Sequence, residues 1–566
     1  MAARAEPIIT AGLRPELFTD SNRFRMSKTL AVVLVSVLVL AGFGFRVSGL
    51  SADGLGEDEL NKLNAVQDYR EHGITAANGE HPMFMKTLQT ASILLAEKLG
   101  TGLSPETALR LPSTIFGALT AILIYLLVTE LFGAEVGLIA AALWSFDPSA
   151  IGFNRIAKED TFLLFFFLLA NVFWLRGQRA AESEPQRRPE LYYWATAASY
   201  GAMMASKYLP QLLAITISYY WIFQAIPETK WRLGKKRMLT FFAIMGGTFL
   251  VLNPAILLPA TWREMGLFAG QKLVGHDGYE FMGKLYTHRL TDWLRGVPWY
   301  FYCVFVTVKL PLLTIAGFLV GVPLLFRRRL GDGRYFILFW MFFWLITFSF
   351  TGGKFTRYFT VMLPAVLITA AIGVHYVTSW LAQRLPVFSQ GGSAFLRATL
   401  VSFVVITALL ASATVAPHYR LFTNAIGGGR AKAGYYFPHD EFYDASMRDS
   451  IAEIARRARP GARVGSESPA VATYYAQRFN RSDLNCVWLS DPNSLRQMTE
   501  GDFIIDARGR RYFSNDALIS GLRQFATPAM QFALGGIPSA NVFMIDETSR
   551  SIVSEAVQRA APLARR

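Results

Sequence analysis

Long apolar runs separated by short polar segments set the pattern of this chain. One run covers Thr29–Phe45, another covers Phe242–Leu258, and a third covers Thr399–Leu410. A helix needs about 20 mainly apolar residues to cross a bilayer, and in lipid only a helix or a closed barrel satisfies its own backbone. The runs are too long and too uniform for barrel strands. The pattern therefore predicts a polytopic α-helical membrane protein.

Basic residues in the connecting loops predict which ends of the helices share a side of the membrane. The first apolar run has a basic flank, and its length favours an uncleaved anchor over a signal peptide. If that flank is cytoplasmic, residues 51–110 lie outside. Counting about eleven spans then brings the basic loops 176–190, 227–238 and 327–334 to the cytoplasmic side. We expect 11 to 13 transmembrane helices, with the chain leaving the membrane near residue 416.

The last 150 residues have a different pattern. A charged helical stretch, a Pro-Gly turn and a short apolar strand follow one another in ARRARPGARVGSES, and GDFIIDARG and SANVFMIDE are typical of buried strands. We therefore expect a soluble α/β domain over residues 417–566, extracytoplasmic by the loop order, after a transmembrane domain over residues 1–416. The aromatic pairs Tyr435–Tyr436 and Tyr474–Tyr475 either bind carbohydrate or pack against the membrane domain.

Composition narrows the class of protein. Of 566 residues, 52% are hydrophobic and 17% are charged, which is too little charge for a string of soluble domains. The formal net charge of +15 is explained by the loops between spans, so we do not expect nucleic-acid binding. Two cysteines, Cys303 and Cys486, provide neither a disulfide framework nor a cysteine metal site.

Ionisable residues from separate segments fall on the predicted outer face. Acids can accept a proton or bind a metal ion, whereas Lys and Arg can hold a phosphate. Charged residues are also ordinary at the ends of spans, so position alone does not establish a function. The set comprises Glu57, Asp58, Glu59, Glu80, His81, Lys86, Arg155, Lys158, Glu159, Asp160, Lys207, Lys272, His276, Asp277, Lys284, Lys354, Arg357 and Tyr358.

Two acidic positions stand out by their context. Asp160 begins a wholly apolar span, where a carboxylate is costly unless it faces a cavity or a partner. Asp58 and Glu59 open an amphipathic stretch whose apolar residues, from Leu60 to Tyr69, recur at helical spacing. This predicts a helix on the membrane surface that begins at the acids. Capping of that helix is the structural alternative for one of them.

Three motifs in this order resemble those of the GT-C glycosyltransferases. They are Asp58-Glu59 after the first span, Glu80-His81-Pro82-Met83-Phe84-Met85-Lys86, and Asn154-Arg155 separated from Asp160 by four residues. The second motif is similar both to His-Pro-Pro-Leu-Gly-Lys of the protein O-mannosyltransferases and to Glu-Lys-Pro-Pro of the bacterial lipid A aminoarabinose transferases. Met83 replaces the second proline, so both branches stay open. The resemblance covers about residues 1–380.

The resemblance implies roles for ten residues. Asp58 is the expected catalytic carboxylate, with Glu59 and Asp160 beside it. Glu80 and His81 are expected on the acceptor or metal side. The donor phosphate is expected on the remaining five, namely Arg155, Lys207, Lys354, Arg357 and Tyr358. No cofactor is certain; a divalent metal ion held by Asp58, Asp160 and Glu80 stays an open alternative.

The expected function is transfer of a sugar from a polyprenyl-phosphate donor to an acceptor hydroxyl of a protein, lipid or glycan. Asp58 would serve as the base, and direct displacement would invert the anomeric centre. The reaction is expected at the extracytoplasmic face of a bacterial plasma membrane. The alternative is a polytopic transporter or lipid flippase. Such proteins concentrate ionisable residues near the midplane, often in paired repeats, and this sequence has no evident repeat.

Overall fold

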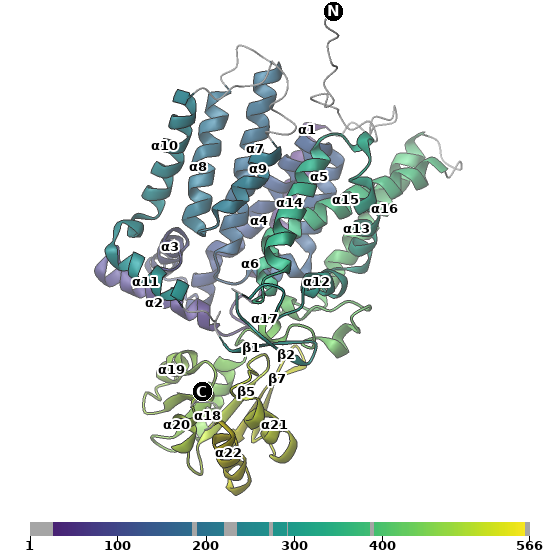
Figure 1. The fold of residues 1–566 in the computed structure, drawn as a ribbon. Helices are drawn as coiled ribbons and strands as arrows, with labels where there is room; N and C mark the ends of the chain where they lie inside the picture. Colours follow the sequence, from purple (N-terminus) through teal and green to yellow (C-terminus); the bar gives the residue numbers. More distant parts are fainter. Residues whose placement is uncertain are drawn as a thin grey trace, which may run out of the picture.

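A layer of long helices carries a mixed α/β domain at one end (Figure 1). The computed structural model describes residues 27–183, 189–219, 235–270, 276–290, 292–384 and 390–560. The polytopic helical fold with a C-terminal α/β domain, predicted from the sequence, is therefore confirmed.

Among the described residues, five helices are long and apolar enough to cross a membrane. A sixth candidate is the pair α5 and α6, which is bent by 62°. The prediction of 11 to 13 spans exceeds this number, because several predicted spans fall on helices that are shorter or more polar. The five are α1 (Lys28–Val47), α4 (Pro105–Phe132), α7 (Asp160–Ser183), α15 (Leu363–Arg384) and α16 (Gln390–Ala413); the bent pair is α5 (Ala134–Phe146) and α6 (Pro148–Asn154).

The remaining helices of the layer explain why fewer membrane-spanning helices are found than were predicted. Figure 1 shows α8 standing between α7 and α10, and α8 packs closely against both. A helix with helical neighbours can be more polar than one surrounded by lipid. The predicted span near 209–226 runs past Tyr219 and out of the described residues. These helices are α8 (Glu190–Ser206), α9 (Leu213–Tyr219), α10 (Lys235–Leu252), α12 (Phe301–Lys309), α13 (Leu312–Leu324) and α14 (Gly333–Ser349).

The outer faces of the helical layer are apolar. On α1, Val32 and Leu40 are 65% and 69% exposed, and on α16, Phe395 is 72% exposed. Such a surface would be unfavourable in water but suits a hydrocarbon solvent. The chain is an integral membrane protein.

Two helices of the first loop lie at the end of the layer that faces the α/β domain. They are α2 (Glu57–His72) and α3 (Phe84–Lys98). The helix predicted to start at the acids is thus present. Its apolar residues, Leu60 and Val66 among them, are buried together with Ile451 of the C-terminal domain. The C-terminal domain and neighbouring helices cover this apolar face, and the position of the helix on the membrane surface stays a prediction.

The C-terminal domain is built on a five-stranded sheet of order β4-β3-β5-β7-β6. β4, β3 and β5 are parallel, with Val464 opposite Cys486 and Phe503, whereas β7 is antiparallel to β5 and β6. The three strands predicted from sequence are β3, β5 and β7. The strands are β3 (Arg463–Ser466), β4 (Asn485–Trp488), β5 (Phe503–Ala507), β6 (Met530–Leu534) and β7 (Ile537–Met544); the helices are α18 (Met447–Arg457), α19 (Pro469–Arg478), α20 (Pro492–Arg496), α21 (Asp516–Phe525) and α22 (Glu547–Ala560).

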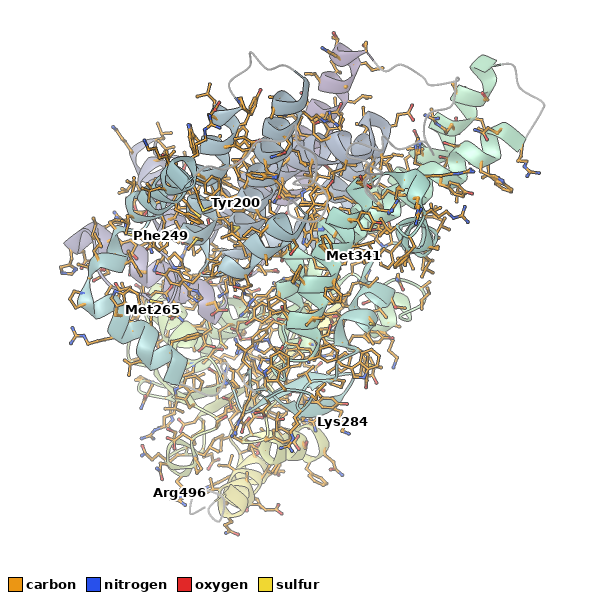
Figure 2. The ribbon with its side chains drawn as sticks, turned by 45° about the horizontal axis from the view of Figure 1, so that its top comes forward. Tyr200, Phe249, Met265, Lys284, Met341 and Arg496 are labelled. Atoms are coloured by element: carbon orange, nitrogen blue, oxygen red, sulfur yellow. The ribbon has the colours of Figure 1, made fainter. Side chains whose placement is uncertain are left out.

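Shorter elements fill the junction between helices and sheet. Figure 2 shows Tyr200 and Met341 within the helical layer, Lys284 near the junction and Arg496 at the far end of the α/β domain. The junction contains α11 (Pro259–Gly270), the antiparallel hairpin β1 (Gly278–Phe281) and β2 (Lys284–Thr287), the 3-10 helix η6 (Thr356–Val361) and α17 (Pro438–Phe442).

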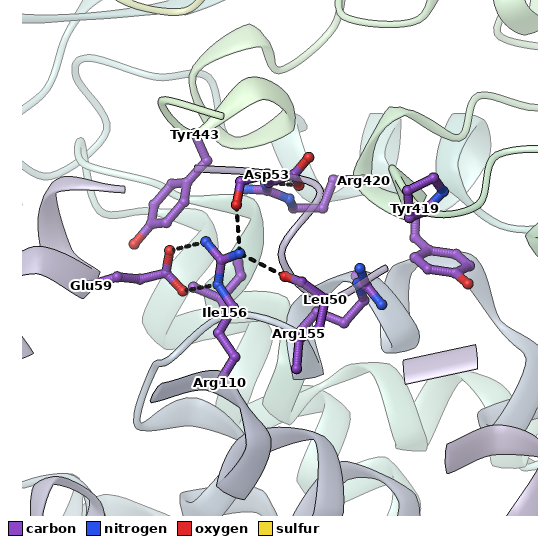
Figure 3. Close-up of a pocket in the computed structure, with 11 residues that line it drawn as sticks. Leu50, Asp53, Glu59, Arg110, Arg155, Ile156, Tyr419, Arg420 and Tyr443 are labelled. Carbon is purple, nitrogen blue, oxygen red and sulfur yellow. Dashed lines mark hydrogen bonds and ion pairs between the residues drawn. The ribbon is translucent and has the colours of Figure 1, made fainter. Parts of the chain in front are cut away.

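A buried ion pair fixes the start of α2 against α4. The Arg110 guanidinium donates to Glu59 through Nε at 2.8 Å and Nη2 at 2.6 Å, and to the carbonyls of Leu50 and Asp53 (Figure 3). It also donates to the Gly54 carbonyl. Glu59 also accepts from the backbone N–H groups of Gly56 and Ala157. Its carboxylate therefore ties the first loop, α4 and the loop before α7 together.

Replacing Glu59 by Gln should destabilise the fold strongly. The change leaves the Arg110 charge buried without a counter-charge, and removing one partner of a buried pair costs about 3–5 kcal/mol. Thermal and denaturant unfolding in detergent will measure this loss. The matched control is Glu97→Gln, whose partner Arg70 is 36% exposed and whose pair should contribute less than about 1 kcal/mol. Equal stability of the two variants would contradict the anchoring role.

Candidate active site

Asp58 is the meeting point of three distant segments. It lies in the first turn of α2, next to the Gly56 N-cap. Lys158 Nζ lies 2.9 Å from Asp58 Oδ2, and Arg357 Nη2 lies 3.3 Å from the same oxygen. The Tyr443 hydroxyl donates to Oδ2 as well, at 3.1 Å. The first loop, the loop before α7, η6 and the segment after α17 therefore converge on one carboxylate.

The two oxygens of Asp58 have different surroundings. All three contacts reach Oδ2, and within the described chain no hydrogen bond or ion pair involves Oδ1. The side chain is 33% exposed. Burial alone would raise the pKa of Asp58, but the positive charges of Lys158 and Arg357 outweigh it and hold the pKa well below the usual value. Asp58 is thus an ionised carboxylate whose Oδ2 is bound by three side chains. Its Oδ1 has no hydrogen-bond partner among the described residues.

A second carboxylate, Glu159, lies buried beside this centre. Lys62 Nζ is 2.8 Å from Glu159 Oε1, His81 Nδ1 is 3.6 Å from the same oxygen, and Lys158 Nζ is 3.8 Å from Oε2. Burial opposes ionisation of Glu159, yet its neighbours hold the pKa well below the usual value. Burial also lowers the pKa of His81 far below the usual value, so its ring is neutral at pH 7. Lys158 bridges Glu159 to Asp58.

The third carboxylate, Asp160, is paired with a cation from another helix end. Lys207 Nζ donates to Asp160 Oδ1 at 2.6 Å, which supplies the partner that a carboxylate at the start of α7 needs. Lys207 Nζ also lies 5.1 Å from the centre of the Tyr358 ring, and the Arg357 guanidinium lies 5.8 Å from it. Both cations therefore lie within cation–π distance of the Tyr358 ring.

Basic side chains gather at this centre. Four of them, from Lys62, Lys158, Lys207 and Arg357, face the three carboxylates described above. The side chain of Arg357 is 13% exposed and that of Lys207 is 18% exposed. Arg and Lys bind both carboxylates and phosphates, so this arrangement can hold an anion.

Four residues expected in the site have other partners. Arg155 donates to the carbonyls of Phe45, Arg46, Ser48 and Gly49 and thereby caps the end of α1. Lys354 Nζ donates to the carbonyls of Val297, at 2.6 Å, and Thr351. Glu59 is bound to Arg110, as described, and Glu80 accepts from Asn78. The structure brings Asp58, Asp160, His81, Lys207, Arg357 and Tyr358 together.

Sequence reasoning assigned no role to four residues that complete the centre. Lys158 and Glu159 precede Asp160 directly, and Lys62 follows Asp58 by one helical turn, so their spacing was a usable signal. Tyr443 lies 385 residues from Asp58 and has no local signal.

The carboxylates expected to bind a metal ion do not converge. Asp58 faces Lys158 and Arg357, Asp160 faces Lys207, and Glu80 accepts from Asn78. Across the described ranges, no group of three or more His, Cys, Asp or Glu side chains could hold a metal ion. These three residues therefore do not fit a shared metal site.

Residues 80–256 match the sequence model of the family described as Dolichyl-phosphate-mannose-protein mannosyltransferase. The segment begins at Glu80 and includes Lys158, Asp160 and Lys207. The match confirms the predicted resemblance to the GT-C glycosyltransferases and the prediction of a polyprenyl-phosphate-sugar-dependent glycosyltransferase. Asp58 and Arg357 lie outside the matched segment, so their roles stay predictions.

Several solved structures are similar at low sequence identity. ArnT from Cupriavidus metallidurans in the apo state is 14% identical, with a TM-score of 0.49, over 92% of this chain and 98% of that one. The apo Archaeoglobus fulgidus oligosaccharyltransferase is 11% identical, with a TM-score of 0.48, over 86% and 70%. The Saccharomyces cerevisiae (S. cerevisiae) Pmt1–Pmt2 complex bound to the sugar donor is 19% identical, with a TM-score of 0.31, over 49% and 40%. No curated protein matches the chain. At these sequence identities and TM-scores, the solved structures assign no role to any residue of this chain.

Proposed function

We propose that this protein transfers a sugar from a polyprenyl-phosphate donor to an acceptor hydroxyl at the extracytoplasmic membrane face, with Asp58 as the base. The observation that carries the proposal is the contact of the Asp58 carboxylate with Lys158 and Arg357. A proton acceptor and two phosphate-binding cations thus lie within one ion-pair distance of each other, beside a third cation on Lys207.

The donor phosphate would bind to the cations that now hold Asp58 Oδ2. Arg357 and Lys207 flank the Tyr358 ring, and Lys158 bridges toward Glu159, so a phosphate between them gains several charge-assisted contacts. A dianion there competes with Asp58 for Lys158 and Arg357. As these contacts weaken, the pKa of Asp58 rises from its lowered value toward the neutral range, where a general base is more effective.

The reaction then needs one displacement. The acceptor oxygen bonds to the anomeric carbon while the bond from that carbon to the phosphate oxygen breaks, and the acceptor proton passes to Asp58 Oδ1. The cations stabilise the negative charge on the departing polyprenyl phosphate. Attack from the face opposite the phosphate inverts the anomeric centre. The acceptor belongs to a protein, a lipid or a glycan.

The extracytoplasmic placement rests on the loop charges. The centre lies near the junction with the α/β domain, whereas α7 ends and α8 begins, next to the Arg-rich segment 176–190, at the opposite end of the layer (Figure 1). By the positive-inside rule, the Arg-rich end is cytoplasmic, as expected for the inner membrane of a bacterium.

Asp58→Asn should abolish most sugar transfer. Loss of a general base costs about 10²–10⁴-fold in rate. Transfer from a labelled polyprenyl-phosphate sugar by purified protein in detergent measures kcat and the donor KM, and the loss should appear in kcat. Asp68→Asn, on the exposed part of the same helix, is the matched control and should retain activity. Full activity in Asp58→Asn would reject the base. Solute uptake by proteoliposomes without any transfer would instead support a transporter.

Arg357→Gln should weaken donor binding. A charge-assisted hydrogen bond contributes about 1.5–3 kcal/mol, so we expect the donor KM to rise by about tenfold or more. Competitive inhibition by polyprenyl phosphate should weaken to a similar extent, which can be measured without turnover. Arg496→Gln, on the far end of the α/β domain, serves as the control (Figure 2). An unchanged donor KM and inhibition constant would remove Arg357 from the phosphate site.

Cysteine labelling should place Thr287 and Lys236 on opposite sides of the membrane. Both side chains are exposed, one on β2 in the junction and the other at the start of α10. In a background without Cys303 and Cys486, a membrane-impermeant maleimide applied to intact cells should label Thr287→Cys only. Lys236→Cys should react after the membrane is opened. Labelling of both positions from outside, or of Lys236→Cys alone, would contradict the proposed orientation.

A further inference from the structure

One contact to Asp58 comes from the C-terminal part of the chain. Tyr443, directly after α17, places its hydroxyl 3.1 Å from Asp58 Oδ2. The ring packs so closely on Gly56 that a Cβ at that position would overlap it. Glycine at the N-cap of α2 therefore gives Tyr443 its access to the carboxylate.

The backbone around Tyr443 is held in an unusual conformation. Tyr443 and Asp444 both have left-handed φ angles, +46° and +59°, and neither is a glycine. Consecutive non-glycine residues rarely adopt this region, and such strain persists only where the surroundings impose it. Here it turns the chain so that Tyr443 faces α2 while Asp444 points back into its own domain.

The strained turn is fixed by Asp444. Arg510 donates to Asp444 Oδ1 at 2.6 Å and forms a second contact with Oδ2, and Ser468 donates to Oδ1 at 3.1 Å. The backbone N–H of Glu57 donates to Asp444 Oδ2 at 3.2 Å. Asp444 thus connects the core of the C-terminal domain to the residue next to Asp58.

Further contacts fasten the same domain to the segment before α2. The Gly54 N–H donates to the Ala445 carbonyl at 3.0 Å, and the Leu55 N–H donates to the Tyr475 hydroxyl at 2.7 Å. Arg448 donates to the carbonyls of Ser51 and Ala52. The segment that positions Asp58 is therefore shaped from two sides, by Arg110 of α4 and by the C-terminal domain.

We propose that Tyr443 is a positioning residue for Asp58 and that the active site is incomplete without the C-terminal domain. This inference rests on the proposed function of Asp58. The phenol holds Oδ2 in place and leaves Oδ1 directed to the acceptor. It keeps this hold when the donor phosphate draws Lys158 and Arg357 away, because an uncharged hydroxyl does not compete for phosphate as they do.

The protonation state of Tyr443 suits this role. Burial and the nearby Asp58 charge raise the pKa of Tyr443 well above its usual value, so the hydroxyl remains a donor. A donor on the ionised form of a carboxylate stabilises that form and lowers its pKa. Removal of the hydroxyl must then raise the pKa of Asp58, and the acid limb of the rate profile must move to higher pH.

Tyr443→Phe is the test, because it removes one oxygen and keeps the ring. We expect kcat to fall about tenfold with little change in the donor KM, and the acid limb of kcat/KM to move up by about one pH unit. Tyr474→Phe is the matched control, since in the part of the chain that the structure describes its hydroxyl hydrogen-bonds to Arg478 and not to Asp58. Thermal unfolding of both variants reports whether the fold is kept.

A second variant keeps the test valid if Tyr443→Phe is unstable. In Gly56→Ala the added methyl group displaces the ring while the hydroxyl is kept, and the same upward pH shift is expected. An unchanged pH profile in a folded Tyr443→Phe protein would overturn the inference, as would equal effects of Tyr443→Phe and Tyr474→Phe. If Asp58→Asn is fully active, the proposed function itself fails; if it is inactive and Tyr443→Phe is normal, only the inference fails.

Discussion

The opposite directions of two neighbouring carboxylates at the start of α2 determine how this end of the molecule is built. Glu59 points into the protein and is bound by Arg110, whereas Asp58 points outward to Lys158 and Arg357. Successive residues of a helix are about 100° apart, so one turn can supply both an anchor and a reactive group. The anchor fixes the helix end, and Lys158, Arg357 and Tyr443 then hold the Asp58 carboxylate itself.

Burying an ionised side chain costs hydration free energy, which explains why the charges around Asp58 and Glu159 form pairs. Lys62, Glu159 and Asp160 are largely removed from water, and an isolated charge in such a place would lose its hydration without compensation. Each is therefore met by an opposite charge within about one hydrogen-bond length. The pairing of Lys62 with Glu159 and of Lys207 with Asp160 thus follows from the cost of burying an isolated charge.

Local sequence signals predicted the elements but only part of the centre. The start of α2 at the acids and the strands β3, β5 and β7 followed from periodicity, whereas the grouping of Asp58 with Asp160 was implied by the resemblance to the GT-C glycosyltransferases. Arg155 and Lys354 were expected to bind the donor phosphate but bind backbone carbonyls, because a cation at the end of a span can have either role. It can face a ligand or satisfy the last carbonyls of a helix or loop, and residue type does not distinguish these uses. The contact of Tyr443 with Asp58 could not be predicted from local sequence, because only the folded chain brings Tyr443 to α2.

The C-terminal α/β domain contributes directly to the surroundings of Asp58. The C-terminal domain has its own sheet and core, yet Asp444 bonds to the backbone of Glu57 and Tyr443 bonds to the side chain of Asp58. A domain that only rested on the helical layer would not need two consecutive residues with left-handed φ angles where it contacts α2. The strain is tolerated because Arg510 and Ser468 hold Asp444 from within the domain. Contacts within the C-terminal domain thus fix the turn from which Tyr443 reaches one carboxylate oxygen of Asp58.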